Sequence, residues 1–131
     1  MSINKDIKQE SFKNQHQKAM VNLIFTYNWT TEQLKQLFEE EGLTMQQFNI
    51  LRILRGSSNP LSTLQIRERM LDKMSDSSRI VDRLILKGLV KKITCKTDKL
   101  LVDVTITAKG LKILEKLDAK EDKQEMIFKS L

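Results

Sequence analysis

The sequence predicts a mainly α-helical fold with a small antiparallel β-ribbon. Apolar residues recur every three or four positions over most of the chain, which is the period of a helix that buries one side. Only between Leu89 and Ile106 does the period change to two, as in a pair of strands. One proline and 5% aromatic residues also favour helices. A chain of 131 residues is expected to form a single domain, 1–131.

The N-terminal third is predicted to be one long helix over residues 12–41, which ends at Gly42 after three acidic residues. Those acids are unfavourable at a helix C-terminus, so we expect basic neighbours or full exposure. Thr30 with Gln33 is an alternative capping box that would split the helix, but we favour one helix, kinked there at most. Its apolar seam consists of Met20, Leu23, Tyr27, Thr30, Leu34 and Leu37, widened by Phe12, Ile24 and Phe38.

The next two helices are marked by capping boxes, in which a Thr or Ser precedes a Gln by three residues. Thr44 predicts a helix that closes at Gly56, and Ser62 predicts a short helix over 63–71. Residues 57–60 form the clear loop between them.

A third helix, over about 76–87, follows a tight turn, is capped by Ser75 or Asp76 and ends near Gly88. Two short helices joined by a turn of this length make a helix-turn-helix. The buried side of the second helix is expected to be Ile80, Leu84 and Ile85.

Two strands joined by a basic turn at 96–99 come next, and Thr107 then caps a final helix with an apolar tail. A ribbon after a helix-turn-helix makes a winged helix-turn-helix, here over residues 44–106. The ribbon's apolar positions are expected to face one another: Val90, Ile93 and Cys95 on one strand, and Leu101, Val102, Val104 and Ile106 on the other.

Positive charge is concentrated in the same segment. From Lys73 to Lys112 there are ten Lys or Arg and four Asp, so this stretch carries +6, the formal charge of the whole chain. A local positive field indicates an anionic partner, and with this architecture the partner expected is double-stranded DNA. The alternative is an ordinary solvated charged face.

The second helix of a helix-turn-helix places its first turns in the major groove. Arg79 can span two acceptors on guanine or hold a phosphate, Asp76 can cap the helix or accept from cytosine, and Arg83 more naturally contacts the backbone. Alternatively, both arginines pair with Asp76 and Asp82 on the surface. The candidate DNA-binding residues are Ser75, Asp76, Ser77, Ser78, Arg79 and Arg83 from the helix, and Lys96 and Lys99 from the wing.

Several short motifs occur in one order and spacing: GLT and QF at 42–48, RIVDRL at 79–84, KGLV at 87–90, DK at 98–99 and ITAKG at 106–110. In these motifs residues 42–110 resemble the MarR family of bacterial regulators. The resemblance implies an obligate homodimer, with dimerisation helices at 12–41 and 108–131, on a pseudo-palindromic operator. It also implies a small ligand that releases or tunes DNA binding.

Three positions depart from the family pattern. Leu100 stands where an arginine is usual and weakens the grip on the minor groove. Arg67 stands where a small residue is common, and Ser77 where an apolar residue is usual. The C-terminus is short for the family, so the dimer interface is expected to depend more on the seam at 20–37.

The sequence gives little support for a disulfide, a redox sensor, a metal site or a catalytic site. Cys95 is single, which rules out an internal disulfide, and a half-buried strand position is favoured over a redox sensor. His16 has no partners at ligand spacing, so no metal site is expected, and no cofactor or catalytic arrangement is visible. We therefore expect no enzyme. The polar N-terminus and the lack of a long apolar run predict a cytoplasmic protein without a membrane segment.

The prediction is therefore a sequence-specific, homodimeric DNA-binding transcriptional regulator. The alternative is a winged-helix module that binds a protein and has no specific DNA binding. The sequence leaves open the operator, the effector, the regulated genes and whether binding represses or activates.

Overall fold

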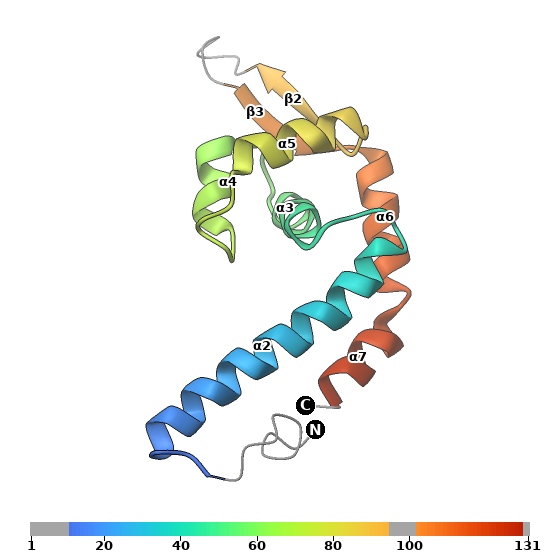
Figure 1. The fold of residues 1–131 in the computed structure, drawn as a ribbon. Helices are drawn as coiled ribbons and strands as arrows, with labels where there is room; N and C mark the ends of the chain where they lie inside the picture. The colour runs from blue at the N-terminus through green and yellow to red at the C-terminus, as the bar shows by residue number, and fades with distance from the viewer. Residues whose placement is uncertain (1–10, 95–101, 130–131) are drawn as a thin grey trace.

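The computed structural model describes residues 11–94 and 102–129, which form a packed upper region and two helices that extend away from it (Figure 1). We call residues 43–118 the winged-helix region, and α2 together with α7 the arm. The elements follow one another as α2 (Gln15–Glu39), α3 (Met45–Arg55), β1 (Leu61–Ser62), α4 (Thr63–Arg69), α5 (Ser77–Leu86), β2 (Val90–Thr94), β3 (Val102–Ile106), α6 (Ala108–Asp118) and α7 (Glu121–Lys129).

Helix α2 is a single helix of 25 residues, about 37 Å long. It begins three residues later than predicted because the Asn14 side chain caps it, accepting a hydrogen bond from the backbone N–H of Gln17. It passes through Thr30 without a break, so the alternative capping box is not used. Nearby, the Thr31 hydroxyl donates to the carbonyl of Asn28 at 3.1 Å, a bond that a helix tolerates.

Both predicted capping boxes are formed, at Thr44 for α3 and at Ser62 for α4. Helix α4 is shorter than predicted, because Met70 has extended backbone angles and ends it at Arg69. Helix α5 is capped by Asp76, which decides between the two predicted caps. The chain then leaves α5 through Gly88, whose φ of 73° is a left-handed conformation that glycine adopts without strain.

The sheet has three strands in the order β1-β3-β2, not the two that were predicted. The short strand β1 pairs antiparallel with β3, with Leu61 opposite Val104. Between β2 and β3, Ile93 lies opposite Asp103 and is 39% exposed, so the prediction that it faces apolar partners is wrong. Its pairing register places it on the outer side of the ribbon. Cys95 and the predicted turn at 96–99 lie outside the described residues.

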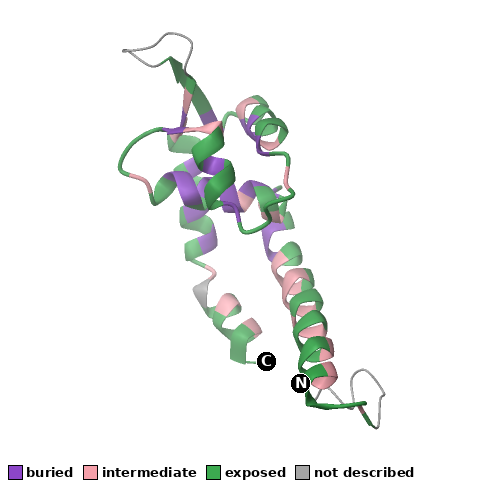
Figure 2. Ribbon diagram, turned by 90° about the vertical axis from the view of Figure 1, so that its left-hand side faces the viewer, coloured by how far each residue is buried: buried purple, intermediate pink, exposed green. Residues whose placement is uncertain are grey.

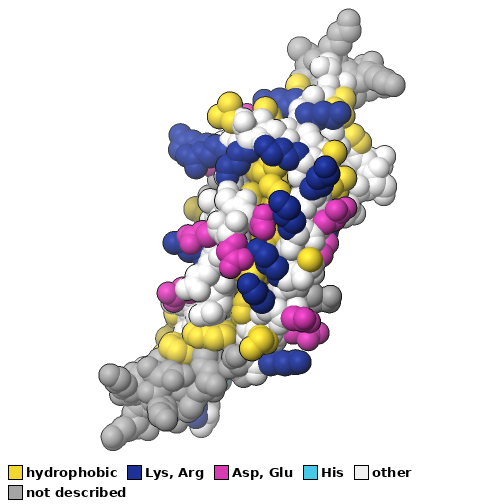
Figure 3. Space-filling model, turned by 90° about the vertical axis from the view of Figure 1, so that its right-hand side faces the viewer, with side chains coloured by type: hydrophobic (Ala, Val, Ile, Leu, Met, Phe, Trp, Pro, Cys, Tyr) yellow, Lys and Arg dark blue, Asp and Glu magenta, His cyan; other side chains and the backbone are white. Residues whose placement is uncertain are grey.

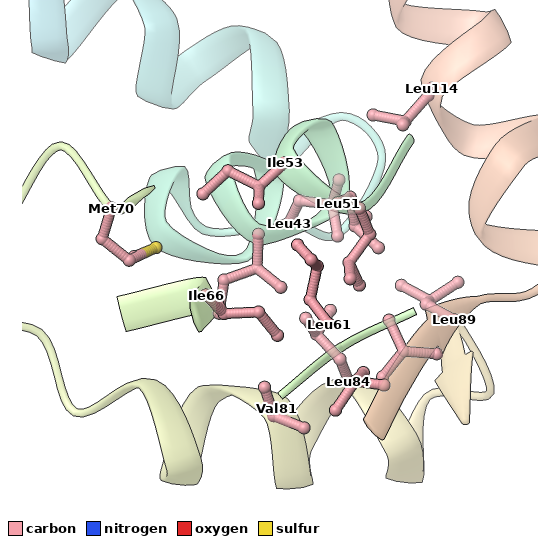
Figure 4. Close-up of a cluster of buried hydrophobic side chains, with 14 of the residues drawn as sticks. Leu43, Leu51, Ile53, Leu61, Ile66, Met70, Val81, Leu84, Leu89 and Leu114 are labelled. Carbon is pink, nitrogen blue, oxygen red and sulfur yellow. The ribbon is translucent and has the colours of Figure 1, made fainter. Parts of the chain in front are cut away.

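The hydrophobic core lies where α3 crosses between α4, α5, α6 and the sheet. Buried residues gather in this upper region, while most of α2 is exposed or half-buried (Figure 2). Val81, which the sequence did not single out, is more deeply buried on α5 than Ile80 and Ile85. Side chains from all these elements point toward one another (Figure 4), among them Leu51, Ile66, Val81, Leu84, Leu89 and Leu114.

The predicted final helix is two helices, α6 and α7. Thr107 caps α6 as expected, because its hydroxyl accepts from the N–H of Gly110. Lys120 lies between the two helices and donates to Glu40 at 2.7 Å and to Glu41 at 3.1 Å. The acidic end of α2 therefore has the basic neighbour that its charge required.

The ion pairs around Lys120 join the end of α2 to the junction between α6 and α7. The hydrogen bond and charge of Lys120 hold the pKa of the Glu40 carboxyl below its usual value, and the same bond raises the pKa of Lys120. Close by, Arg55 at the end of α3 makes a two-pronged contact with Asp118 of α6, at 2.7 and 3.4 Å. No helix in the described part of the chain is long and apolar enough to cross a membrane.

Candidate nucleic-acid interface

Helix α5 has one buried side and one exposed side, and the exposed side carries the predicted DNA-binding residues. Ser77, Val81 and Leu84 are buried against the core. The exposed positions are Ser78, Arg79, Asp82, Arg83 and Leu86. Because the inner face fixes how the helix is rotated, Arg79 and Arg83 are held on the outside, one turn apart.

The first turn of α5 is organised by Asp76. Its Oδ1 atom accepts the backbone N–H of Arg79 at 3.2 Å, which satisfies one of the free donors at the helix start. A carboxylate at this point also interacts favourably with the helix dipole. The position of Asp76 is thus explained by capping, and its side chain remains exposed beside Ser78 and Arg79.

The three predicted serines occupy different environments. Ser78 is exposed, Ser75 is half-buried in the preceding turn, and Ser77 is only 3% exposed. The hydroxyls of Ser75 and Ser77 are buried and have no hydrogen-bond partner among the residues that the structure describes. The Ser77 side chain therefore faces the interior, on the same side of α5 as Val81.

The two arginines are available for a partner. Neither Arg79 nor Arg83 forms an ion pair with any residue that the structure describes. Asp82 instead pairs with Lys92 of β2 at 3.4 Å, and Asp76 is used as the cap. The alternative in which both arginines are neutralised by these two acids is therefore not what the structure contains.

Several other cations of the +6 segment have roles within the protein. The Lys87 ammonium donates to the carbonyl of Gly42 at 2.6 Å and to the Gln47 side chain at 2.9 Å, which joins the end of α5 to the start of α3. Lys109 donates to the carbonyl of Lys87 at 3.0 Å. Lys92 partly neutralises Asp82, as described above. The charge count of the sequence therefore overstates how many lysines are free to meet DNA.

The cations also extend beyond α5. Lys and Arg side chains spread over the face that carries α6, with Asp and Glu among them, and hydrophobic side chains gather toward its lower end (Figure 3). Lys112 and Lys116 of α6 are exposed. The mixture of signs makes this face a weaker candidate for DNA than α5. The predicted wing residues Lys96 and Lys99 lie outside the described residues.

Two clefts flank the start of α5, and the sequence pointed to neither. The cleft on the α3 side, about 300 Å³, is lined in part by Thr44, Gln46 and Arg83. The cleft on the α4 side, about 420 Å³, is lined by Thr63, Leu64, Arg67, Met74, Ser75, Asp76, Ser77 and Ser78. The sequence did not predict that residues of α4 line this cleft. The helical period shows which side of α4 is buried, but it does not show which other element lies beside its exposed side.

Metal binding has no evident site here. Over residues 11–94 and 102–129, no three His, Cys, Asp or Glu side chains lie close enough together to hold a metal ion.

Comparison with known proteins gives one consistent result. No protein-family model matches the sequence, and no curated protein sequence matches it either. Among solved structures, a MarR transcription factor from Planctomyces limnophilus is 30% identical, with 92% of this chain and 88% of that chain covered and a TM-score of 0.74.

Two more distant structures have the same fold. A MarR-like transcription regulator from Bacillus cereus is 19% identical with a TM-score of 0.80, over 88% of this chain and 84% of its own. A MarR mutant from E. coli, complexed with operator DNA, is 20% identical with a TM-score of 0.78, over 93% and 88%. The fold predicted from the sequence, mainly α-helical with a winged helix-turn-helix, is thereby confirmed.

Proposed function

Because this chain belongs to the MarR family of transcription regulators, we propose that it is a homodimeric regulator that binds specific double-stranded DNA through α5. The observation that carries the proposal is the outer face of α5. Arg79 and Arg83 are exposed there without an ionic partner among the described residues, and Ser78 lies beside them. An exposed recognition helix with free guanidinium groups suits the donor and acceptor pattern of the major groove.

Each residue of this face is proposed to make a different contact with the DNA. Arg79, in the first turn, contacts a guanine edge or a phosphate, while Arg83, one turn later, holds the backbone. Ser75, Asp76, Ser77 and Ser78 belong to the same contact region, in which Ser77 is buried and supports the position of the exposed Ser78. Lys96 and Lys99 form the wing contact with the minor groove or flanking phosphates.

The arm supplies the dimer interface. Met20, Leu23, Ile24 and Tyr27 of α2 are 55 to 73% exposed, although they form one apolar seam. Met126 and Phe128 of α7 are also more than half exposed. An apolar face of this extent calls for a partner surface. We propose that 12–41 and 108–131 form the dimerisation part and 44–106 the DNA-binding part.

A dimer of this kind places two α5 helices in successive major grooves, about one helical turn of DNA apart, so its operator is pseudo-palindromic. A small effector that changed the angle between the subunits would move the helices out of register and release the DNA. An open cleft of about 560 Å³ between α2 and the start of α3, lined in part by Lys35, Leu43 and Met45, is where we propose such a ligand would act. No catalytic activity belongs to this proposal, and chromosomal DNA as the target places the protein in the cytoplasm.

Selection of bound fragments from bacterial genomic DNA, followed by titration at several salt concentrations, tests the proposal. We expect enriched fragments with an inverted repeat, and an affinity that falls linearly with salt on logarithmic axes. If Arg79 reads a base, Arg79→Ala should weaken DNA binding by about 1–3 kcal/mol and relax the base preference at one operator position. An equal loss of affinity for all DNA sequences would instead assign Arg79 to the DNA backbone. Arg52→Ala is the matched control, because Arg52 is an exposed arginine of α3 that lies outside the proposed dimerisation part and lines neither cleft beside α5.

The competing hypothesis is a winged-helix module that binds a protein. It predicts no enriched fragment, a flat salt dependence and a protein partner that co-purifies. Under that outcome Arg79→Ala would leave DNA binding unchanged.

A further inference from the structure

Two exposed apolar side chains stand at the edge of the cleft between α4 and the start of α5. Leu64, in the first turn of α4, is 64% exposed, and Met74, in the turn before α5, is 92% exposed. Both line the 420 Å³ cleft, together with Arg67, Ser75, Asp76 and Ser78. Two large apolar groups are thus left in water next to the region proposed to bind DNA.

These two side chains are not required by the core. Helix α4 contributes Ile66, which is fully buried, and the chain contributes Met70 just after it, at 2% exposed. Leu64 lies on the other side of the same helix. Burial within the subunit therefore explains Ile66 and Met70 but leaves Leu64 and Met74 unexplained.

The charge and the openness of the cleft indicate which kind of partner covers Leu64 and Met74. Arg67 supplies a cation, and Asp76, the acid among the lining residues, is already bound to the first turn of α5. The cleft is open, with its apolar groups at the rim, so it suits a broad partner surface better than an enclosed small molecule. A duplex docked on α5 would bring an anionic backbone and the base edges of the major groove to this rim.

On the basis of the proposed function, we propose that Leu64 and Met74 contact the C5-methyl groups of thymines, and that Arg67 holds an adjacent phosphate. Thymine is the base that presents a methyl group in the major groove, and apolar side chains recognise it by contact. The unbranched, polarisable side chain of Met74 can adapt to the position of the methyl. The reading surface is then built from two helices, with α4 adding specificity at positions that α5 does not reach.

Replacement of single thymines by deoxyuridine in a selected fragment tests this inference, because the exchange removes only the methyl group. For the wild-type protein we expect roughly fourfold weaker binding at one or two positions in each half-site, the value for one buried methyl. The double variant Leu64→Ala/Met74→Ala should bind the thymine fragment more weakly and no longer distinguish the two bases. Arg67→Gln should lower the slope of log affinity against log salt by about 0.9.

Two matched controls come from the same region. Leu71 and Leu86 are 82% and 88% exposed but do not line the cleft, so Leu71→Ala and Leu86→Ala should keep the discrimination against deoxyuridine. All four apolar positions are exposed, so the variants should melt at the wild-type temperature, and this is checked by circular dichroism.

The outcomes separate the two proposals. Wild-type binding that is equal for thymine and deoxyuridine at every position would overturn the inference while the proposed function stands. Full discrimination by the double variant would do the same. If the wild-type protein enriches no fragment at all, the proposed function fails, and this inference fails with it.

Discussion

The winged-helix region and the arm use similar helices in opposite ways. In α3, six of eleven residues are buried, and its apolar residues meet neighbours of the same chain on several sides. In α2, only Leu37 and Phe38 of 25 residues are buried, at the end where the helix joins the core. The apolar residues nearer its start remain in water (Figure 2). An amphipathic helix therefore needs a second surface that covers its apolar side. For α3 the same subunit supplies that surface, and for most of α2 it does not.

The largest expected effect comes from breaking the arm's apolar seam. Leu23→Asp places a charge in the proposed interface, where it would lose its hydration without gaining a partner. We expect a monomer by sedimentation, and DNA affinity lower by roughly 10²- to 10⁴-fold, because two linked contacts become one. Asn22→Asp adds the same charge at an exposed site outside the seam and should remain a dimer. A Leu23→Asp protein that stayed dimeric would refute the proposed role of the arm.

Shortening a buried side chain tests whether the winged-helix region, unlike the arm, is stabilised by packing within the subunit. Leu84→Ala removes a fully buried side chain and should lower the free energy of unfolding by about 2–5 kcal/mol. Leu86→Ala, two residues further along α5 and 88% exposed, should change it by less than about 0.5 kcal/mol. Denaturant titration measures both. Similar losses for the two variants would contradict the burial pattern of α5.

The close approach of α6 to the strand ends gives a smaller effect. A Cβ atom on Gly110 would lie 2.4 Å from the carbonyl oxygen of Leu89 and 2.7 Å from the Ile106 side chain. Gly110→Ala should therefore cost about 1–3 kcal/mol of stability as the helix shifts outward. At Gly56 the nearest atom is 3.4 Å away, so Gly56→Ala is a control that we expect to cost little. Thermal melts measure both variants. A lower melting temperature for Gly110→Ala alone would show that the loss comes from the close contact at Gly110, and not from replacing a glycine by alanine in general.

The smallest effect is expected where charge joins the end of α2 to the junction between α6 and α7. Lys120 lowers the pKa of Glu40 in the folded protein, so this pair stabilises the fold above the usual carboxyl pKa and the contribution is lost as pH falls through the lowered value. Lys120→Gln should return the pKa of Glu40 toward its usual range, as measured by NMR titration of the carboxyl group. Lys116→Gln, an exposed lysine on the neighbouring α6, should leave it unchanged. Because Glu40 is half-exposed, salt should weaken the effect.

The candidate site shows where prediction from residue types succeeds and where it stops. Asp76 and Thr107 were recognisable as caps, because capping depends on contacts within three residues. Ser77 was counted among the contact residues because it is polar, although it lies two helical turns before Leu84 and stands where an apolar residue is usual, and both signs indicate a buried position. The pairing of Asp82 with Lys92 joins a helix to a strand, and helical periodicity says nothing about such contacts.

The sequence by itself determined the local features of this protein: the caps of α3, α4 and α6, the change of period at the ribbon, and the concentration of cations from Lys73 to Lys112. Each depends on interactions between near neighbours or on composition alone. Only the tertiary structure decided which cations remain free, that β1 joins the sheet, and that Leu64, Arg67 and Met74 meet the start of α5 in one cleft. Those outcomes depend on the packing of segments distant in sequence, where small differences in side-chain shape and helix length set which residues meet.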